Sequence, residues 1–81
     1  MGQEEQEKGG HVAWAQVVTN PVGADISVDG LPTGKQTPSR VEISAGIHVV
    51  TLKLNGYQIS RRTVQVTEGS TVNIDEKLRA K

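Results

Sequence analysis

Oxygen-bearing side chains at alternate positions form the first pattern in this sequence that could bind a metal ion. Asp25, Ser27 and Asp29 precede a glycine, as ligands do in the first half of an EF-hand calcium loop, where such oxygens surround a hard cation. The position that should supply a bidentate glutamate is Gln36, and Pro32 interrupts the loop. The stretch is therefore interpreted as a strand with a polar outer face, and no metal or other cofactor is expected.

A glycine-rich segment invites comparison with a phosphate-binding P-loop. Residues 30–37 read GLPTGKQT, whereas a P-loop leads into a helix whose first amides cradle phosphate. One residue is missing between the glycines, Gln36 separates Lys35 from the hydroxyl, and no helical pattern follows. These glycines are assigned to turns.

The basic side chains give two further candidates. His48 shares a face with apolar residues, so it is either a pH-sensitive group or, as favoured here, a histidine at the edge of the core with one hydrogen bond. A metal site is disfavoured because His11 is the only other histidine. Arg61 and Arg62 either bind an acidic partner or, preferably, protect an edge strand as solvated charges. No serine, histidine and carboxylate have the spacing of a nucleophile and its base, so enzymatic activity is not expected.

Composition limits the chain to one small domain. It has 81 residues and no cysteine, so a packed core must stabilise it without disulfides. Nine basic residues balance nine acidic ones, which argues against nucleic acid as a partner. No apolar run approaches the roughly 20 residues of a membrane span, so no transmembrane segment is expected in this chain. Residues 1–10 are predicted to be a disordered linker or a chain end that lies outside the domain, and residues 11–81 to form the domain.

Alternating polarity predicts short strands separated by turns. Ala24, Ile26 and Val28 alternate with polar residues, which indicates a half-buried strand. A type I turn is predicted before it at 20–23 and a tight hairpin after it at 29–30; a second hairpin is predicted at 55–56. Pro32 restricts the following segment to a sheet edge. The residues assigned to structural turns are Asn20, Pro21, Gly23, Gly30, Gly46, Asn55 and Gly56.

The remaining strands are expected at 11–19, 40–43, 47–54, 57–66 and 71–78. The first strand leaves open whether its odd or even positions face inward. Tyr57 and Ile59 have the opposite parity to Val64 and Val66, which predicts a β-bulge near 61–62. Since turn signals recur every 8 to 12 residues or so and no helical period appears, the sequence predicts an antiparallel sandwich of about seven strands.

Outward-facing apolar residues are the best candidates for binding. If the even positions of 47–54 face inward, then Ile47 and Val49 face outward, and Trp14 is expected to join them. Contiguous exposed apolar groups usually mark a contact surface. The alternative is that a neighbouring strand, the linker or an adjacent domain covers them.

The order of these turns and strands resembles the PEGA domain, a small all-β module of bacteria and archaea. Its signature stands here as Pro21-Val22-Gly23-Ala24, with valine in the glutamate position. The resemblance spans residues 17–78 and implies an immunoglobulin-like or transthyretin-like sandwich. It also implies that the domain is part of a surface-layer-like protein or of the extracytoplasmic tail of a membrane-anchored protein, such as some protein kinases. The resemblance supplies no catalytic residues. The other matching residues are Val28, Asp29, Gly30, Gly34, Thr37, Pro38, Ala45, Gly46, His48, Val50, Gly56 and Tyr57.

Three functions are consistent with this sequence. The preferred one is a non-catalytic interaction or spacer module of a larger extracytoplasmic or cell-surface protein, whose partners are a protein or cell-envelope component and adjacent domains. The second is a carbohydrate- or peptidoglycan-binding sensor of a membrane-anchored protein kinase. Because Trp14 and Tyr57 are the only aromatic residues, platforms for sugars are scarce. The third is an accessory domain that holds a catalytic domain at a set distance.

Overall fold

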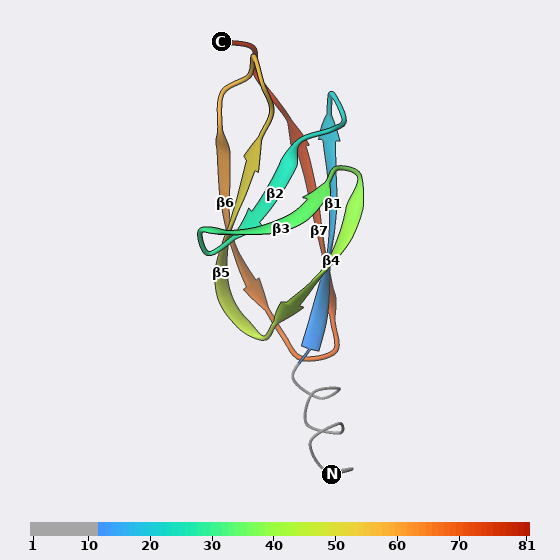
Figure 1. Cartoon of the computed structure of the whole chain (residues 1–81). Helices are drawn as coiled ribbons and strands as arrows, with labels where there is room; N and C mark the ends of the chain where they lie inside the picture. Colours follow the sequence, from blue (N-terminus) through green and yellow to red (C-terminus); the bar gives the residue numbers. More distant parts are fainter. Residues whose placement is uncertain (1–11) are drawn as a thin grey trace.

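The protein is a sandwich of two stacked β-sheets (Figure 1). The computed structural model describes residues 12–81, so the predicted linker and His11 lie outside the described residues. The three-stranded sheet has the order β4-β1-β7, and the four-stranded sheet has the order β3-β2-β5-β6. The prediction of an all-β sandwich of about seven strands is confirmed. The strands are β1 (Val12–Asn20), β2 (Asp25–Val28), β3 (Leu31–Gln36), β4 (Ser39–Ser44), β5 (Gly46–Lys53), β6 (Ser60–Val66) and β7 (Thr71–Lys77).

Four of the five strand pairings are antiparallel, and the fifth is parallel. In the parallel pairing, β1 lies beside β7 from Trp14 opposite Thr71 to Asn20 opposite Lys77. The predicted antiparallel pattern did not include this pair, because turn residues specify hairpins only between consecutive strands. The first and last strands instead pair within the three-stranded sheet, although they are far apart in the sequence.

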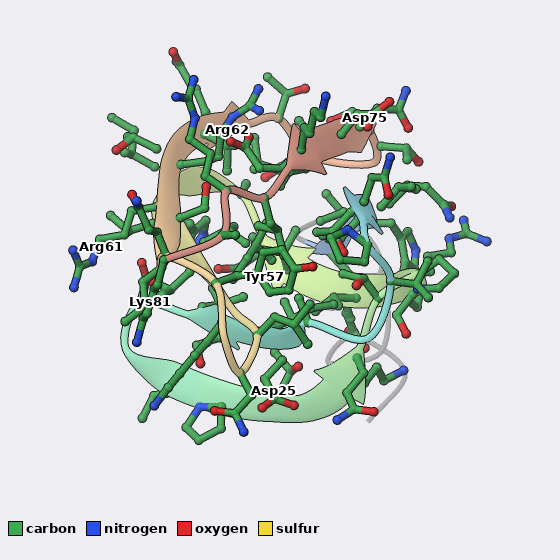
Figure 2. The ribbon with its side chains drawn as sticks, turned by 90° about the horizontal axis from the view of Figure 1, so that it is seen from above. Asp25, Tyr57, Arg61, Arg62, Asp75 and Lys81 are labelled. Carbon is green, nitrogen blue, oxygen red and sulfur yellow. The ribbon has the colours of Figure 1, made fainter. Side chains whose placement is uncertain are left out.

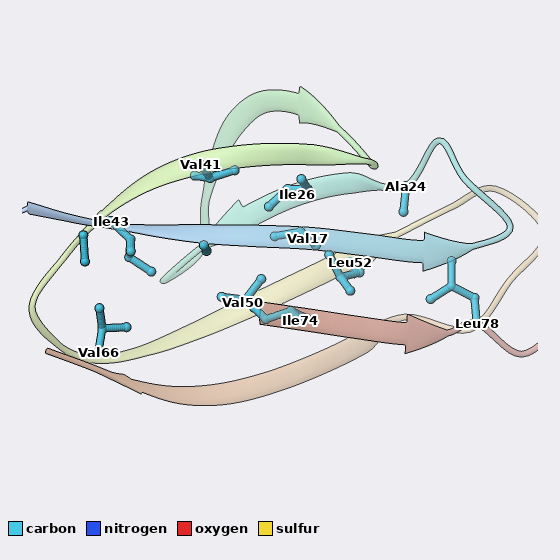
Figure 3. Packing of buried hydrophobic residues seen from close by; sticks show 12 residues of the cluster. Val17, Ala24, Ile26, Val41, Ile43, Val50, Leu52, Val66, Ile74 and Leu78 are labelled. Carbon is cyan, nitrogen blue, oxygen red and sulfur yellow. The ribbon is translucent and has the colours of Figure 1, made fainter. Parts of the chain in front are cut away.

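The core consists of small and branched aliphatic side chains from the inner faces of both sheets (Figure 3). In β1 the odd positions face inward, which resolves the ambiguity of that strand: Ala13, Ala15 and Val17 are buried. The alanines leave room for the larger residues of the facing sheet. The buried apolar residues are Ala13, Ala15, Val17, Ala24, Ile26, Val41, Ile43, Val50, Leu52, Val66, Ile74 and Leu78.

The turn between β2 and β3 is a two-residue hairpin, as predicted. Asp29 and Gly30 both have positive φ, 53° and 83°, as a type I′ turn requires, and Val28 pairs with Leu31 across it. At the end of β5, Gly56 also has positive φ, and the Tyr57 amide donates to the Leu54 carbonyl at 3.0 Å. This second turn does not close a two-residue hairpin, because the last residues of β5 and β6 in register are Leu52 and Ser60.

The predicted type I turn at 20–23 is replaced by a corner between the two sheets. The Gly23 amide donates to the Thr37 carbonyl at 2.9 Å, and the Asn20 carbonyl accepts from the Leu78 amide at 2.9 Å. The groups that would close a local turn therefore bond to distant segments. Gly46, also predicted as a turn residue, has a positive φ and begins β5.

The predicted bulge near Arg61 and Arg62 is absent from the β5–β6 pairing, whose register is continuous. The change of parity has a simpler cause: β6 begins at Ser60, so Ile59 lies outside it and is 48% exposed. Tyr57 is partly buried against the core and lies at the centre of one end of the sandwich (Figure 2). The irregularity occurs instead between β2 and β3, where β3 is an edge strand, as expected from Pro32.

Candidate interaction surfaces

Ile47 and Val49 lie on the outer face of the four-stranded sheet. Val50 and Leu52 on the same strand are fully buried, and the alternation leaves Ile47 69% and Val49 37% exposed. Their partners across the β5–β6 pairing are Gln65 and Thr63, and directly opposite residues share a face. The two side chains therefore form a small apolar area on an otherwise polar face, and their binding role stays a prediction.

Trp14 lies on the other side of the molecule, on the outer face of the three-stranded sheet. Ala13 and Ala15 flank it and are buried, so its side chain points away from the core. The guanidinium carbon of Arg40 lies 4.8 Å from the centroid of the indole ring, a cation–π arrangement that occupies one face of the ring. The structure thus separates Trp14 from Ile47 and Val49, because β1 and β5 belong to different sheets.

A cluster of three polar residues joins the two sheets at one end of β5. His48 Nδ1 lies 2.6 Å from a carboxylate oxygen of Asp29, and His48 Nε2 lies 2.8 Å from the carbonyl oxygen and 3.2 Å from the hydroxyl oxygen of Ser44. The other carboxylate oxygen of Asp29 accepts from the Val49 amide at 2.9 Å. His48 therefore bonds through both ring nitrogens rather than through one, and it connects β4, β5 and the β2–β3 turn.

The acceptors around His48 favour its charged form. A carboxylate and a carbonyl oxygen both lack a proton to give, so the two contacts are satisfied together when both ring nitrogens carry protons, as in the imidazolium form. The hydrogen bond to Asp29 raises the pKa of His48 above 6.5, the Ser44 carbonyl adds to this, and burial opposes it. The hydrogen bond from His48 and the Val49 amide lower the pKa of Asp29 below 3.8.

The order of these groups resembles a Ser-His-Asp triad, but the hydrogen bonds do not support that chemistry. A general base needs a free lone pair on the nitrogen that faces the serine hydroxyl. Here that nitrogen, Nε2, makes its shorter contact with the carbonyl oxygen of Ser44 and donates to it. The cluster consequently acts as a structural link between the sheets. Sequence reasoning found His48 and Asp29 separately and did not find Ser44, because no periodicity relates the three elements.

The charge state of His48 predicts a pH dependence of stability. Because its folded pKa exceeds the unfolded value of 6.5, its contribution is complete below pH 6.5 and is lost as the pH rises through the raised value. We expect the free energy of unfolding, measured by urea titration, to fall over that range in the natural chain. The slope should disappear in His48→Gln and persist in His11→Gln, which removes the other histidine. Equal slopes in all three proteins would contradict the assignment.

The carboxylates of β2 do not converge on a common point. Asp25 begins β2, whereas Asp29 follows its last residue in the turn, and Asp25 accepts from the Gln36 side-chain amide at 3.0 Å. Within residues 12–81, no three histidine, cysteine, aspartate or glutamate residues are grouped to hold a metal ion. Residues 25–28 form strand β2, as the alternation of this stretch predicted.

The two adjacent arginines have different environments. Arg62 forms an ion pair of 2.7 Å with Glu76, which connects β6 of one sheet to β7 of the other. Arg61 is exposed and points away from the sandwich (Figure 2). Because β6 is an edge strand, both charges lie where they hinder pairing with another strand.

A cavity of about 160 Å³ lies beside this ion pair, between residues 58–60 and 76–79. Pockets for small organic ligands usually measure about 300–1,000 Å³. This cavity is smaller and is lined by the already paired Glu76, by other polar residues and by the apolar Ile59 and Leu78. It has room for a few water molecules.

No helix in the part of the chain described here is long and apolar enough to cross a membrane.

The fold and its polar clusters define a small β-sandwich module in which the hydrogen bonds of the polar side chains support the fold. A family model, the PEGA domain, matches residues 15–81. The chain therefore belongs to the PEGA domain family, as its turn residues suggested. The comparison with curated proteins found no match.

Proposed function

We propose that this chain is a non-catalytic module that spaces and connects parts of a larger cell-surface or other extracytoplasmic protein. The observation that carries the proposal is that the described chain starts and finishes at opposite ends of the sandwich (Figure 1). At one end, the carbonyl oxygen of Val12 accepts from the Gly69 amide at 3.0 Å. At the other end, the Lys81 amide donates to the Gly56 carbonyl at 3.1 Å.

The length of the sandwich supports a spacing role. β1 has nine residues, and a strand rises about 3.3 Å per residue, so β1 alone extends for about 30 Å. Segments joined before Val12 and after Lys81 leave from opposite ends of this length. A folded module then keeps them apart by a fixed distance, whereas a flexible linker of equal residue number allows them to meet.

The apolar area on the four-stranded sheet supports a contact role for the same module. Ile47 and Val49 lie opposite the uncharged Gln65 and Thr63 of β6, and the Asp29 carboxylate on the other side of Val49 is already bonded to His48 and to the Val49 amide. Covering the two apolar side chains therefore removes apolar surface from water. The partner that fits is a protein or cell-envelope component, including an adjacent domain of the same polypeptide. A location outside the cytoplasm is proposed from the family, whose members occur in surface and envelope proteins.

A carbohydrate- or peptidoglycan-binding sensor of a membrane-anchored kinase ranks second. Trp14 is the aromatic residue on a flat outer face, but Arg40 occupies one side of its ring. Sugar sites need an open aromatic face with polar groups around it. Glycan binding by the chain that is lost in Trp14→Ala would place the sensor first.

The contact role predicts a specific loss of binding. In cosedimentation with the envelope fraction of cells that encode the chain, the double variant Ile47→Ser/Val49→Thr should bind at least about tenfold more weakly, since its interface loses apolar burial. Val22 is 62% exposed and supplies the matched control Val22→Thr, which should bind as the natural chain does.

Three results decide between the roles. Weaker binding by the double variant alone supports the contact surface. Equal binding by all proteins removes Ile47 and Val49 from it. If the natural chain does not bind, the spacing role is tested by replacing the folded module in the encoding protein with an equally long Gly/Ser linker, which should abolish function. Retained function, or turnover by the chain alone, would overturn the proposal.

A further inference from the structure

We propose that this module bears tensile load between its two ends, and that the parallel pairing of β1 and β7 is the element that resists the load. The inference rests on the proposed spacing role, because a spacer joined at both ends transmits any force between its neighbours. It adds a mechanical property that spacing alone does not require. Four features of the structure carry it.

The first feature is the direction of the two terminal strands. β1 and β7 are neighbours in one sheet and run parallel, with registered pairs from Trp14 opposite Thr71 to Asn20 opposite Lys77. Both strands therefore run from the end of the sandwich that holds Val12 towards the end that holds Lys81 (Figure 1). The strand that follows the amino-terminal segment and the strand that precedes the carboxy-terminal one are thus bonded directly to each other.

The second feature is the direction of the force relative to these bonds. Tension on the two chain ends draws β1 towards its first residue, Val12, and β7 towards its last residue, Lys77. The strands are then pulled past each other along their length, and the interstrand hydrogen bonds of the parallel pair are loaded together. If force pulled the strands apart from one end, the bonds would break one pair at a time.

The third feature is the central position of β1. It is also paired with β4, from Val12 opposite Ser44 to Val17 opposite Ser39, so it is hydrogen-bonded on both sides. Withdrawing β1 would break both pairings and expose its buried residues. β7 has a single partner in its sheet, so the β1–β7 pairing is where we expect rupture.

The fourth feature is the anchoring of the segment after β7. The Leu78 amide donates to the Asn20 carbonyl at 2.9 Å, and the Leu78 side chain is buried. Beyond it, the Arg79 carbonyl accepts from the Gln58 amide at 2.7 Å. Residues 79–81 can separate under tension without moving β7, whereas Leu78 must leave the core before β7 slides. The load therefore reaches a strand that is held at its far end.

The test compares two pulling directions in the same chain by single-molecule force spectroscopy. Because the sequence contains no cysteine, introduced cysteines fix the handle positions. One variant carries His11→Cys and Lys81→Cys, which loads the β1–β7 pairing along the strands. The other carries His11→Cys and Thr71→Cys; these handles precede the first residue of β1 in the sequence and begin β7, so the force separates the two strands from one end. Urea unfolding of both variants provides the control for equal stability without force.

We expect the first variant to rupture in one event at a force several-fold higher than the second, at equal pulling speed and equal equilibrium stability. Forced unfolding reports the barrier along the pulled direction rather than the overall stability. Equal rupture forces, or gradual extension of the first variant without a force peak, would overturn the inference. Such a result leaves the proposed spacing role intact, since spacing needs only the folded shape. Conversely, the first variant could rupture at high force while the encoding protein keeps its function with the Gly/Ser linker. That pair of results would overturn only the proposed function.

Discussion

Truncation of Ile26 to alanine is expected to lower the free energy of unfolding by about 2–5 kcal/mol. Ile26 is 1% exposed and lies in the middle of the four-stranded sheet, on β2, opposite Leu52 of β5. Its side chain faces the inner side of the other sheet, so alanine leaves a cavity that neighbouring side chains fill incompletely. For a domain of this size, whose total stability is about 4–12 kcal/mol, the variant would lose a large fraction of its folded population at 37 °C.

Ile47→Ala is the matched control for this prediction. It deletes the same atoms from the same sheet, but Ile47 is 69% exposed on the outer face, so we expect a change within about 0.5 kcal/mol. Urea titrations of both variants should give different midpoints and equal slopes, since the surface exposed on unfolding is nearly unchanged. Equal losses in the two variants would mean that the inner and outer faces of this sheet are assigned incorrectly.

The strands whose alternation is regular could be predicted from the sequence. In β4, Val41 and Ile43 are buried as expected, and the Asp29–Gly30 hairpin follows from residues that tolerate positive φ. These features depend on neighbours in the chain. The β1–β7 pairing joins strands from opposite ends of the domain's sequence, so no local pattern records it.

The errors at Ile59 and Trp14 have different physical origins. Periodicity treats each apolar residue as inward-facing and assigns a parity to it. Ile59 is exposed because it lies in the connection before β6 rather than in a strand. Because the odd positions of β1 face inward, the even position of Trp14 correctly gives an outward direction. Parity does not say, however, to which of the two sheets a strand belongs. Its expected proximity to Ile47 therefore required the topology.

The inter-sheet cluster and the corner at Thr37 could not be predicted for a related reason. Asp29 and Ser44 reach His48 from a turn and from the other sheet. The sequence places Thr37 only in a rejected P-loop comparison and in the family resemblance, although its hydroxyl bonds to groups far away in the chain. Hydrogen-bond partners that are distant in sequence are specified by three-dimensional packing, and threonine is an ordinary strand residue.

Substitution of Thr37 by valine is expected to lower the free energy of unfolding by about 2–3 kcal/mol, because it leaves the buried Ala24 amide without an acceptor and removes the partner of the Thr19 hydroxyl. The Gly23 amide keeps the Thr37 carbonyl as its acceptor. Thr37 is 4% exposed. Its hydroxyl oxygen accepts from the Ala24 amide at 2.9 Å and from the Gly23 amide at 3.1 Å, and it bonds to the Thr19 hydroxyl at 2.5 Å. With both lone pairs used by the amides, the Thr37 hydroxyl donates to Thr19, which in turn donates to the Pro21 carbonyl at 2.8 Å.

Valine has nearly the shape of threonine, so this variant separates hydrogen bonding from packing. Thr37→Ser keeps the hydroxyl and removes a methyl group, and it should lose about 1 kcal/mol. Thr63→Val makes the same chemical change on the exposed outer face of β6, where we expect a change within about 0.5 kcal/mol. Thermal and urea unfolding of the three variants should therefore rank Thr37→Val as much the least stable. If Thr37→Ser were the less stable of the two Thr37 variants, packing of the methyl group rather than the hydroxyl would hold the corner between the sheets.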